Sequence, residues 1–404
     1  MDGNYNKNNM TFREFRDQFP GVRNQAYFDV AARGLISTSV RSAIDSYLDS
    51  RMHGGDKASM FDMVERARIK FASLIRADAD EIGMTKNISD GLNTIAAGLD
   101  WHPGDNVVIA TDLEHPANIL PWYNLALKKG IQIKSISPGS NGEMPVGMLA
   151  EAVDDATRIL AVSTVSFSPG FKTNLVPLAE AAHRKGALLL VDAAQSAGIL
   201  STDVKESGID VLSTSTQKGL LALYGLGFMY VRKNLAEEFQ PAYLSRLGVT
   251  LTGEHEATSA GFEEFRYAAG ARRFDVGNHN YIAAVGVEQS LTDLLKINPE
   301  TTEAYVVDLA SKLRNGLESI GIPVLRSKDN LGEAHIVAVG SNLSDNHDGT
   351  DNQDILELHT HLKQNNVIHS IRRGILRLSL HAYNDLSDVD YALDIAKKWA
   401  QTKK

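Results

Sequence analysis

The chain alternates between short apolar runs and segments with helical periodicity over most of its first 280 residues. Residues 175–185 repeat their apolar positions at the spacing of an amphipathic helix, which ends at Gly186. Strands that alternate with helices predict βαβ units around a mostly parallel sheet, and uninterrupted apolar runs are typical of strands covered on both faces. The runs that predict strands lie at residues 107–111, 159–166, 187–194, 211–216 and 227–231.

The pattern changes after about residue 280, where helices and strands no longer alternate regularly. We therefore predict an α/β chain with a large domain, a mostly parallel central sheet covered by helices, and a smaller α+β C-terminal domain. The domain limits that we expect are an N-terminal arm at 1–25, a large domain at 26–280 and a small domain at 281–404. Within the small domain the patterns predict helices at 303–320, 352–367 and 388–400, and strands at 335–340 and 376–383.

Composition narrows the possible functions. The net charge of -9 over 404 residues disfavours a protein that binds nucleic acid by neutralising phosphates. No apolar stretch approaches the roughly 18 residues of a membrane helix, and the polar first ten residues lack a signal-peptide core. We expect a soluble cytoplasmic protein without a membrane or nucleic-acid partner. The chain has no cysteine, which excludes disulfides and thiolate chemistry of its own, and no histidine group has the spacing of a metal site.

Two charged residues follow successive predicted strands. Asp192 ends the run at 187–194, and Lys218 comes shortly after the run at 211–216. Ligands of open α/β sheets bind at the carboxyl ends of strands. Alone, Asp192 could cap the next helix and Lys218 could be a solvated surface lysine. Together they match the needs of pyridoxal 5′-phosphate (PLP), an imine-forming lysine and an acid for the ring nitrogen.

Three further segments carry candidate chemistry. Ser89 precedes a helical pattern and could bind a phosphate at the helix N-terminus, although simple helix capping explains it as well. His115 follows the run at 107–111 and could stack on a ring and move protons, or lie in a surface loop. Arg377 lies in a predicted strand and could bind a substrate carboxylate, assisted by Arg372 or Arg373, or it could form an internal salt bridge.

Six motifs in sequence order resemble fold-type I PLP enzymes of the class V aminotransferase group. The likeness is greatest to cysteine desulfurases, selenocysteine lyases, cystine C–S lyases and isopenicillin-N-epimerase-like proteins, and it covers nearly the whole chain. The motifs are Tyr27–Ala32, Glu114–Trp122, Val191–Gln195, Ser215–Lys218, Arg273–Asn278 and Arg377–Asn384.

The resemblance implies a role for each candidate residue. In the family, the residue that matches Asn278 reaches the phosphate of the neighbouring subunit, which implies a homodimer with shared active sites. The resemblance assigns the phosphate to Ser89, Ser215 and Gln217, the ring nitrogen to Asp192, the phenolic oxygen to Gln195, ring stacking to His115, the Schiff base to Lys218 and the substrate carboxylate to Arg377.

The chain departs from the desulfurase pattern at several positions. Gln217 stands where desulfurases usually have histidine. Several aminotransferases of the wider group also have glutamine at this position. Residues 220–225 replace a glycine-proline pair, and Phe167 stands where an asparagine often faces the substrate. Because the chain has no cysteine, persulfide transfer through a nucleophilic cysteine of its own is excluded.

The resemblance implies an enzyme that acts on an amino acid through an external aldimine and a quinonoid. We favour β-elimination of the C–S lyase kind, because His115 lies in a lyase-like framework. Transamination to an α-keto acid is the alternative, supported by Gln217, and epimerisation is a lesser one. A non-catalytic scaffold is disfavoured by the presence of Lys218, Asp192 and Arg377 together. A Rossmann-type nucleotide site has only Gly225 and Gly227 in its support.

The substrate's side chain is expected to meet the loop at 241–270, the N-terminal segment and the partner subunit. An acidic or sulfonated substrate is expected if Arg33 or Arg266 faces the pocket. The polar candidates are Arg33, Asp56, Arg266 and Tyr267.

Overall fold

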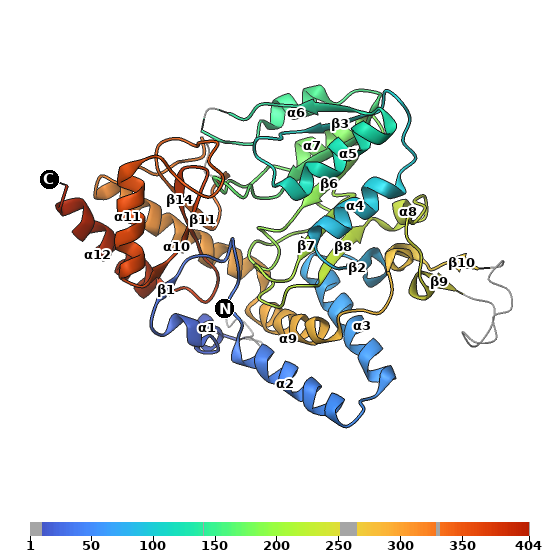
Figure 1. The fold of residues 1–404 in the computed structure, drawn as a ribbon, viewed down its shortest axis with the longest axis horizontal. Helices are drawn as coiled ribbons and strands as arrows, with labels where there is room; N and C mark the ends of the chain where they lie inside the picture. Colours follow the sequence, from blue (N-terminus) through green and yellow to red (C-terminus); the bar gives the residue numbers. More distant parts are fainter. Residues whose placement is uncertain (1–9, 140, 251–264, 329–331, 404) are drawn as a thin grey trace, which may run out of the picture.

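A seven-stranded sheet forms the centre of the molecule, in the order β2-β8-β7-β6-β5-β3-β4 (Figure 1). The computed structural model describes residues 10–139, 141–250, 265–328 and 332–403. The strand β8 is antiparallel to both of its neighbours, and all other pairs in the sheet are parallel. The strands are β2 (Ile82–Thr85), β3 (Asn106–Ile109), β4 (Gln132–Ser135), β5 (Thr157–Ser163), β6 (Leu188–Asp192), β7 (Val211–Ser215) and β8 (Gly227–Val231).

Helices cover both faces of this sheet, as the uninterrupted apolar runs predict. Successive strand residues point to opposite faces, so Leu189 joins the apolar core on one side and Leu190 joins the core on the other. Helices α4 and α5 pack on the Leu190 side, and α3, α6, α7 and α9 pack on the Leu189 side. The helices of this part are α2 (Thr38–Met52), α3 (Lys57–Leu74), α4 (Ile88–Gly98), α5 (Leu120–Lys129), α6 (Val146–Ala152), α7 (Val176–Arg184), α8 (Lys233–Ala236) and α9 (Tyr281–Ile297).

The C-terminal part forms a second, antiparallel sheet in the order β11-β14-β13. Its residue Arg377 lies opposite Ala338 on one neighbouring strand and opposite Ser370 on the other. The remaining elements are β11 (Ile336–Val339), β13 (Ser370–Arg372), β14 (Ile375–Ser379), α10 (Pro299–Ser319), α11 (Gln353–Gln364) and α12 (Leu386–Gln401).

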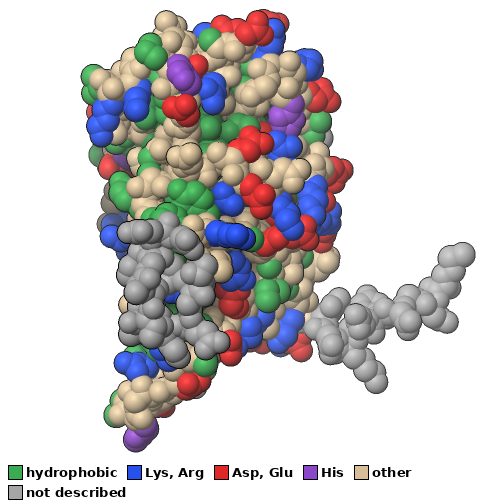
Figure 2. All heavy atoms as spheres, turned by 90° about the vertical axis from the view of Figure 1, so that its right-hand side faces the viewer, with side chains coloured by type: hydrophobic (Ala, Val, Ile, Leu, Met, Phe, Trp, Pro, Cys, Tyr) green, Lys and Arg blue, Asp and Glu red, His purple; other side chains and the backbone are tan. Residues whose placement is uncertain are grey.

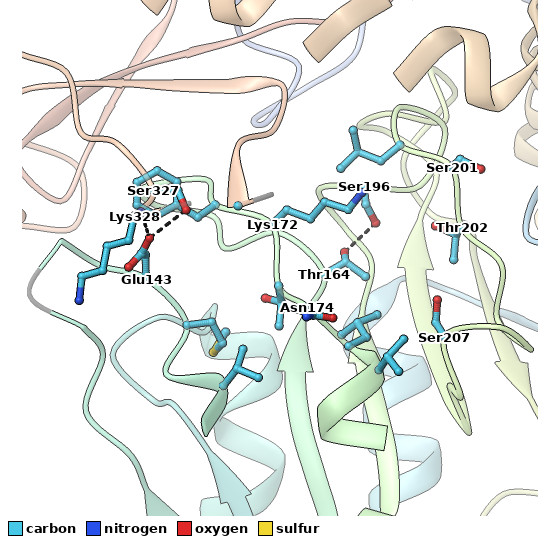
Figure 3. Close-up of a pocket in the computed structure, with 18 residues that line it drawn as sticks. Glu143, Thr164, Lys172, Asn174, Ser196, Ser201, Thr202, Ser207, Ser327 and Lys328 are labelled. Atoms are coloured by element: carbon cyan, nitrogen blue, oxygen red, sulfur yellow. Dashed lines mark hydrogen bonds between the residues drawn. The ribbon is translucent and has the colours of Figure 1, made fainter. Parts of the chain in front are cut away.

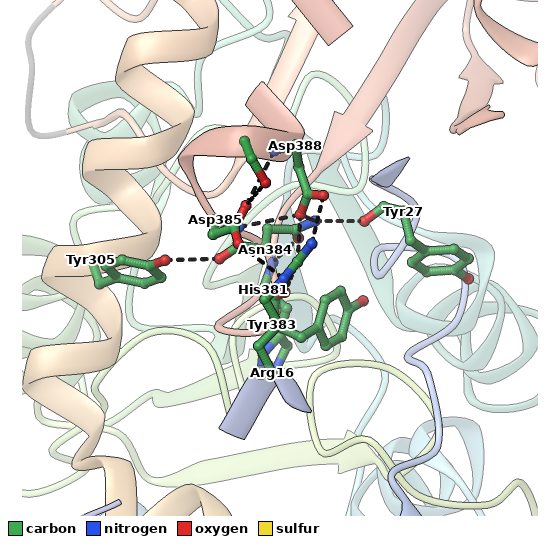
Figure 4. Close-up of polar contacts among 9 residues, drawn as sticks. Arg16, Tyr27, Tyr305, His381, Tyr383, Asn384, Asp385 and Asp388 are labelled. Atoms are coloured by element: carbon green, nitrogen blue, oxygen red, sulfur yellow. Dashed lines mark hydrogen bonds and ion pairs between the residues drawn. The ribbon is translucent and has the colours of Figure 1, made fainter. Parts of the chain in front are cut away.

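The N-terminal segment is bound to this C-terminal part. β1 (Ala26–Tyr27) pairs in parallel with β12 (Val367–Ile368), just after the short helix α1 (Phe12–Asp17). Figure 4 shows Arg16 reaching the start of α12, where its guanidinium nitrogens lie 2.7 and 2.9 Å from the carboxylate of Asp388. These contacts hold the N-terminal segment in place just before the loop at 28–34, and this loop contacts the candidate site.

The structure confirms the predicted fold class. β8 has the predicted limits, and the other predicted strands and helices are found with ends that differ by a few residues. Sequence patterns missed α2, α3 and α9. The apolar repeats of α3 and α9 are interrupted by buried polar residues, Arg68 in α3 and Ser290 and Asp293 in α9. The domain limits stay a prediction, and α9, which begins at Tyr281, packs against α2 and α3.

The surface carries both signs of charge. Basic and acidic side chains lie interspersed on the face shown in Figure 2, in keeping with the modest net charge of -9. Among the residues that the structure describes, no helix combines the length and the apolar character that crossing a membrane requires.

Candidate active site

The candidate residues gather at the carboxyl ends of four adjacent strands. β3, β5, β6 and β7 lie side by side and run in parallel. His115 lies in the loop after β3, Asp192 is the last residue of β6, and Lys218 follows β7 by three residues. The two predicted strand ends therefore meet at one edge of the sheet, where open α/β sheets bind their ligands.

Asp192 and Lys218 are electrostatically coupled. Asp192 is 4% exposed, and its Oδ1 accepts a hydrogen bond of 2.8 Å from the backbone of Ala194. Burial raises the pKa of Asp192, and the nearby Lys218 lowers it. Burial lowers the pKa of Lys218 to about 8, although the negative charge of Asp192 raises it. An amine with this pKa is partly neutral near pH 7, as imine formation requires.

The lysine loop is held by the N-terminal segment. The backbone of Gly34 donates a hydrogen bond of 2.8 Å to the carbonyl oxygen of Gln217. A β-carbon at position 34 would clash with the carbonyl oxygen of Lys218, so the close approach of these loops requires glycine at this position. The first motif of the resemblance and the lysine motif therefore lie in contact.

His115 caps the short helix η3 (Pro116–Asn118). Its Nδ1 accepts a hydrogen bond of 3.2 Å from the backbone of Ala117, so the ring proton of the neutral form is assigned to Nε2. The ring lies edge-on to Phe167, with 5.8 Å between the ring centroids. Burial, followed by the charge of Lys218, lowers the pKa of His115 to about 4. The imidazole is therefore neutral at pH 7.

The start of α4 faces the same edge. Asn87 caps this helix, so the capping that could have explained Ser89 is supplied by another residue. A β-carbon at Gly91 would clash with Ser213, so glycine lets the first turn of α4 lie against β7. Ser89 and His115 line a cavity of about 470 Å³ together with Asn93, Pro116, Ala117, Leu120, Pro121 and Asn124.

Three residues of the motifs named above carry a buried polar atom that has no hydrogen-bond partner among the described residues. The atoms are Gln195 Oε1, Ser215 Oγ and Arg377 Nε. Buried polar atoms are nearly always paired, so these three are candidates for contacts with a polar ligand. The donors and acceptors suit PLP: a carboxylate for the ring nitrogen, an amide for the phenolic oxygen and hydroxyls at a helix N-terminus for the phosphate.

Arg377 is buried at the rim of this site without a close carboxylate. It is 2% exposed, its Nη1 donates 2.8 Å to the carbonyl oxygen of Phe167, and its nearest carboxylate oxygen, on Asp29, is 4.0 Å away. Burial lowers the pKa of Arg377 to about 10. Arg372 lies on the same face of the β13–β14 hairpin and pairs with Asp348 at 3.0 Å. The guanidinium of Arg373 bonds the backbone of Asp112.

The other predicted residues differ in their positions. Asn278 is exposed on the surface after η6 (Gly270–Phe274). Gln217 contacts Gly34 through its backbone oxygen. Of the four polar candidates for the side-chain pocket, Arg33 is exposed near Asp29, Asp56 caps α3, and Arg266 and Tyr267 form the exposed strand β10, which pairs with β9 (Val249–Thr250). Residues 251–264 of the loop expected to build that pocket lie outside the described residues.

Sequence reasoning missed Glu114 and Ser163. Glu114 is 2% exposed and accepts hydrogen bonds from Ser163, the last residue of β5. Glu114 stands in a motif that carries the resemblance, but neither periodicity nor spacing shows that a loop glutamate beside His115 is buried. Only the position of β5 between β3 and β6 brings Ser163 to this edge.

A second cavity is larger than the one beside Ser89 and His115. Figure 3 shows this space of about 590 Å³, where Glu143 bonds Ser327 and Thr164 bonds Ser196. None of Lys218, Asp192, His115 or Arg377 lines it. Residues at the strand ends, and not cavity size, therefore define the candidate active site.

The seven-stranded, mostly parallel sheet together with the small antiparallel C-terminal sheet is the architecture of fold-type I PLP enzymes. Residues 26–392 match the family model described as aminotransferase class-V. The chain belongs to this family of PLP-dependent enzymes.

Three known proteins illustrate the likeness. An uncharacterized aminotransferase of Bacillus subtilis (strain 168), YcbU, is 28% identical over 94% of this chain and 96% of its own length. A probable cysteine desulfurase of Pyrococcus abyssi is 28% identical over 95% of this chain and 96% of its own length. The solved structure of the cystine C–S lyase C-DES with its reaction product cysteine persulfide superposes with a TM-score of 0.82 at 22% identity, covering 94% of this chain and 99% of that one.

Proposed function

We propose that this chain binds PLP on Lys218 and catalyses β-elimination from an amino acid, without a catalytic cysteine. The observation that carries the proposal is the placement of Lys218 and Asp192 at adjacent strand ends, and the three buried polar atoms of the motifs that have no partner among the described residues support it. When bound, PLP supplies an aldehyde that joins an amine and a ring that withdraws electrons from the substrate's Cα.

The residues around Lys218 hold and orient the cofactor in this proposal. The carboxylate of Asp192 would bind the ring nitrogen and keep it protonated. The side-chain amide nitrogen of Gln195, which donates one hydrogen bond to the carbonyl oxygen of Ala31, would donate its second to the phenolic oxygen. His115 stacks on the ring in its neutral form, since its pKa is about 4. The phosphate is bound by Ser89, Ser215 and Gln217, and by Asn278 of a second copy of the chain.

Lys218 moves the proton of the reaction. With a pKa of about 8, its amine takes a proton from the substrate's Cα near neutral pH and returns it later. Arg377 binds the substrate carboxylate, because its Nε is unpaired and its nearest carboxylate is 4.0 Å away. β-Elimination then breaks the bond between Cβ and the leaving group, and hydrolysis releases an α-keto acid and ammonia.

β-Elimination is our first choice among the reactions. The chain matches desulfurases and a cystine C–S lyase over nearly its full length, and it has no cysteine with which to carry a persulfide. Transamination is the second candidate, favoured by Gln217 and by the likeness to a protein named as an aminotransferase. Epimerisation is a lesser alternative.

The first experiment is an absorbance spectrum of the purified protein with PLP, followed by product assays on a panel of amino acids. We expect a band near ~420 nm that is absent from Lys218→Ala. Keto acid and ammonia formed without an acceptor would support β-elimination, and turnover that requires an added α-keto acid would replace it with transamination. No band with saturating PLP would contradict the whole proposal.

The shared active site is a separate part of the proposal. We propose a homodimer, because Asn278 is exposed and the resemblance assigns the matching residue to the phosphate of the neighbouring subunit. Light scattering should give the mass of two chains, and Asn278→Ala should weaken PLP binding without changing that mass. A monomer with full PLP affinity would contradict it. The cytoplasmic location and the division at residue 280 stay predictions.

A further inference from the structure

We propose that Glu114 is a positioning residue, which holds the turn that carries His115 and places a buried negative charge beside Asp192. The inference rests on the proposed function, since both of its targets are residues that we assign to the cofactor. Glu114 is 2% exposed, and nothing in the roles given above uses it.

Three donors converge on the carboxylate of Glu114. The backbone of Ser163 donates 2.7 Å to Oε1, and the Ser163 hydroxyl and the side-chain amide of Asn118 donate to Oε2, the latter at 2.8 Å. Ser163 pairs in register with Asp192 on the next strand. Glu114 therefore links the loop after β3 to the end of β5, one strand away from Asp192.

The same carboxylate closes the His115 turn. The side-chain bond from Asn118 to Glu114 spans the turn, and the backbone of Asn118 donates 2.8 Å to the carbonyl oxygen of His115. Asn118 is fully buried, and its Oδ1 has no partner among the described residues. The imidazole of His115 thus projects from a turn that is fastened on both sides by Glu114.

The charge of Glu114 also acts on Asp192. Burial and, next to it, the charge of Asp192 together raise the pKa of Glu114 to about 7, against the hydrogen bonds from Ser163 and Asn118, which lower it. The charged or titratable groups around it are Asp192, with Lys218 beyond it, His115 on its own loop, and Arg373, which bonds the backbone of Asp112. An ionised Glu114 adds negative potential near Asp192, which favours a proton on the ring nitrogen that Asp192 binds.

Two variants separate the two effects. In Glu114→Gln the amide oxygen can accept from Ser163, and the amide nitrogen can donate to Asn118 Oδ1 after rotation of that side chain. This variant therefore loses the charge of Glu114 but keeps the hydrogen bonds that hold the turn. Glu114→Ala loses both the charge and these hydrogen bonds. Glu318 is an exposed carboxylate paired with Arg326, so Glu318→Gln is the matched control for changing an acid to an amide.

The cofactor-loaded test measures kcat/KM and the ¹⁵N NMR titration of labelled PLP. We expect Glu114→Ala to lose roughly 10- to 100-fold in kcat/KM, because His115 is no longer fixed. Glu114→Gln should keep kcat/KM within roughly threefold, while its ring nitrogen releases its proton about one pH unit lower than in the wild type. Equal loss in both variants with an unchanged titration would overturn the inference.

A second test uses the cofactor-free protein, so it does not depend on the proposed function. The pKa of Glu114 is raised from 4.5 to about 7 by folding, so its contribution to stability is full below pH 4.5 and is lost as the pH rises through 7. As the pH rises from 4.5 to 7, the Tm of Glu114→Gln should therefore increase relative to the Tm of the wild type. The Tm of Glu318→Gln should show no such relative increase. A constant difference in Tm between Glu114→Gln and the wild type across this range would show that folding does not raise the pKa of Glu114, and so that its carboxylate is not desolvated beside Asp192.

Discussion

Two buried arginines of this chain have opposite surroundings. Arg68 is 1% exposed and pairs with Asp275 at 2.6 Å, while the backbone of Met84 donates to the other oxygen of that carboxylate. Arg377 is 2% exposed, has an unpaired Nε and lies 4.0 Å from its nearest carboxylate. The pKa of Arg68 is raised by Asp275 and Glu65 against the effect of burial, whereas that of Arg377 falls to about 10.

The difference teaches how to separate structure from function in a buried charge. A buried charge destabilises the folded protein unless it is paired, and Arg68 has a complete set of partners. Arg377 lacks them, which is expected of a group whose partner arrives with the substrate. The network of Arg16 with Asp385 and Asp388 resembles the Arg68 arrangement, since Arg16 contacts both carboxylates within 3.0 Å (Figure 4).

The largest expected effect comes from Arg377 in the proposed reaction. Arg377→Ala should lower kcat/KM by roughly 100-fold or more, because the substrate carboxylate loses a bidentate partner. Its free energy of unfolding should change less than that of an Arg68 variant, since Arg377 has one hydrogen bond to the carbonyl oxygen of Phe167 and a carboxylate no nearer than 4.0 Å. Steady-state kinetics and urea unfolding measure both quantities, and a stability loss as large as that of an Arg68 variant would make Arg377 a structural residue.

The reverse outcome is expected for Arg68. Arg68→Ala leaves the carboxylate of Asp275 buried without its partner, which costs about 3–5 kcal/mol of unfolding free energy. Folded protein at low temperature should still bind PLP, because Arg68 does not contact the strand ends that carry Lys218. Replacing both residues, in Arg68→Met with Asp275→Leu, should recover part of the loss.

A smaller effect is expected from Arg16, which is partly exposed. Arg16→Ala should cost about 1–3 kcal/mol of unfolding free energy through the lost bonds to Asp388. Urea unfolding of this variant beside Arg13→Ala, an arginine of the same helix, isolates the contribution of the network. Equal stability of the two variants would mean that the contacts in Figure 4 do not anchor the N-terminal segment.

A further expected effect is a pH dependence of the cofactor-free protein. Folding lowers the pKa of Lys218 from 10.5 to about 8, so its contribution to stability is present above pH 10.5 and is lost as the pH falls through 8. Lys218→Met should therefore gain in Tm over the wild type as the pH falls across this range. Parallel pH curves for the two proteins would show that Lys218 is not held in a desolvated position.

Much of this site was predictable from strand ends, and part of it was not. Apolar runs that stop at Asp192 and just before Lys218 place both residues at one sheet edge, because parallel strands end on the same side. The sequence does not show which loop lies beside which. Contacts such as Gly34 with the lysine loop, or Glu114 with Ser163, join segments far apart in the chain. For the same reason the sequence does not show which arginines lack a close carboxylate, since Arg68 and Arg377 look alike in the sequence.

The central claim is that Lys218 carries the cofactor, and chemical trapping tests it most directly. The protein would be incubated with PLP, reduced with borohydride, digested and mapped by mass spectrometry, with Lys218→Ala and Lys172→Ala as paired variants. The account predicts one phosphopyridoxyl group on the peptide that contains Lys218, retained in Lys172→Ala and absent from Lys218→Ala. Modification of a different lysine, or none at saturating PLP, would contradict it.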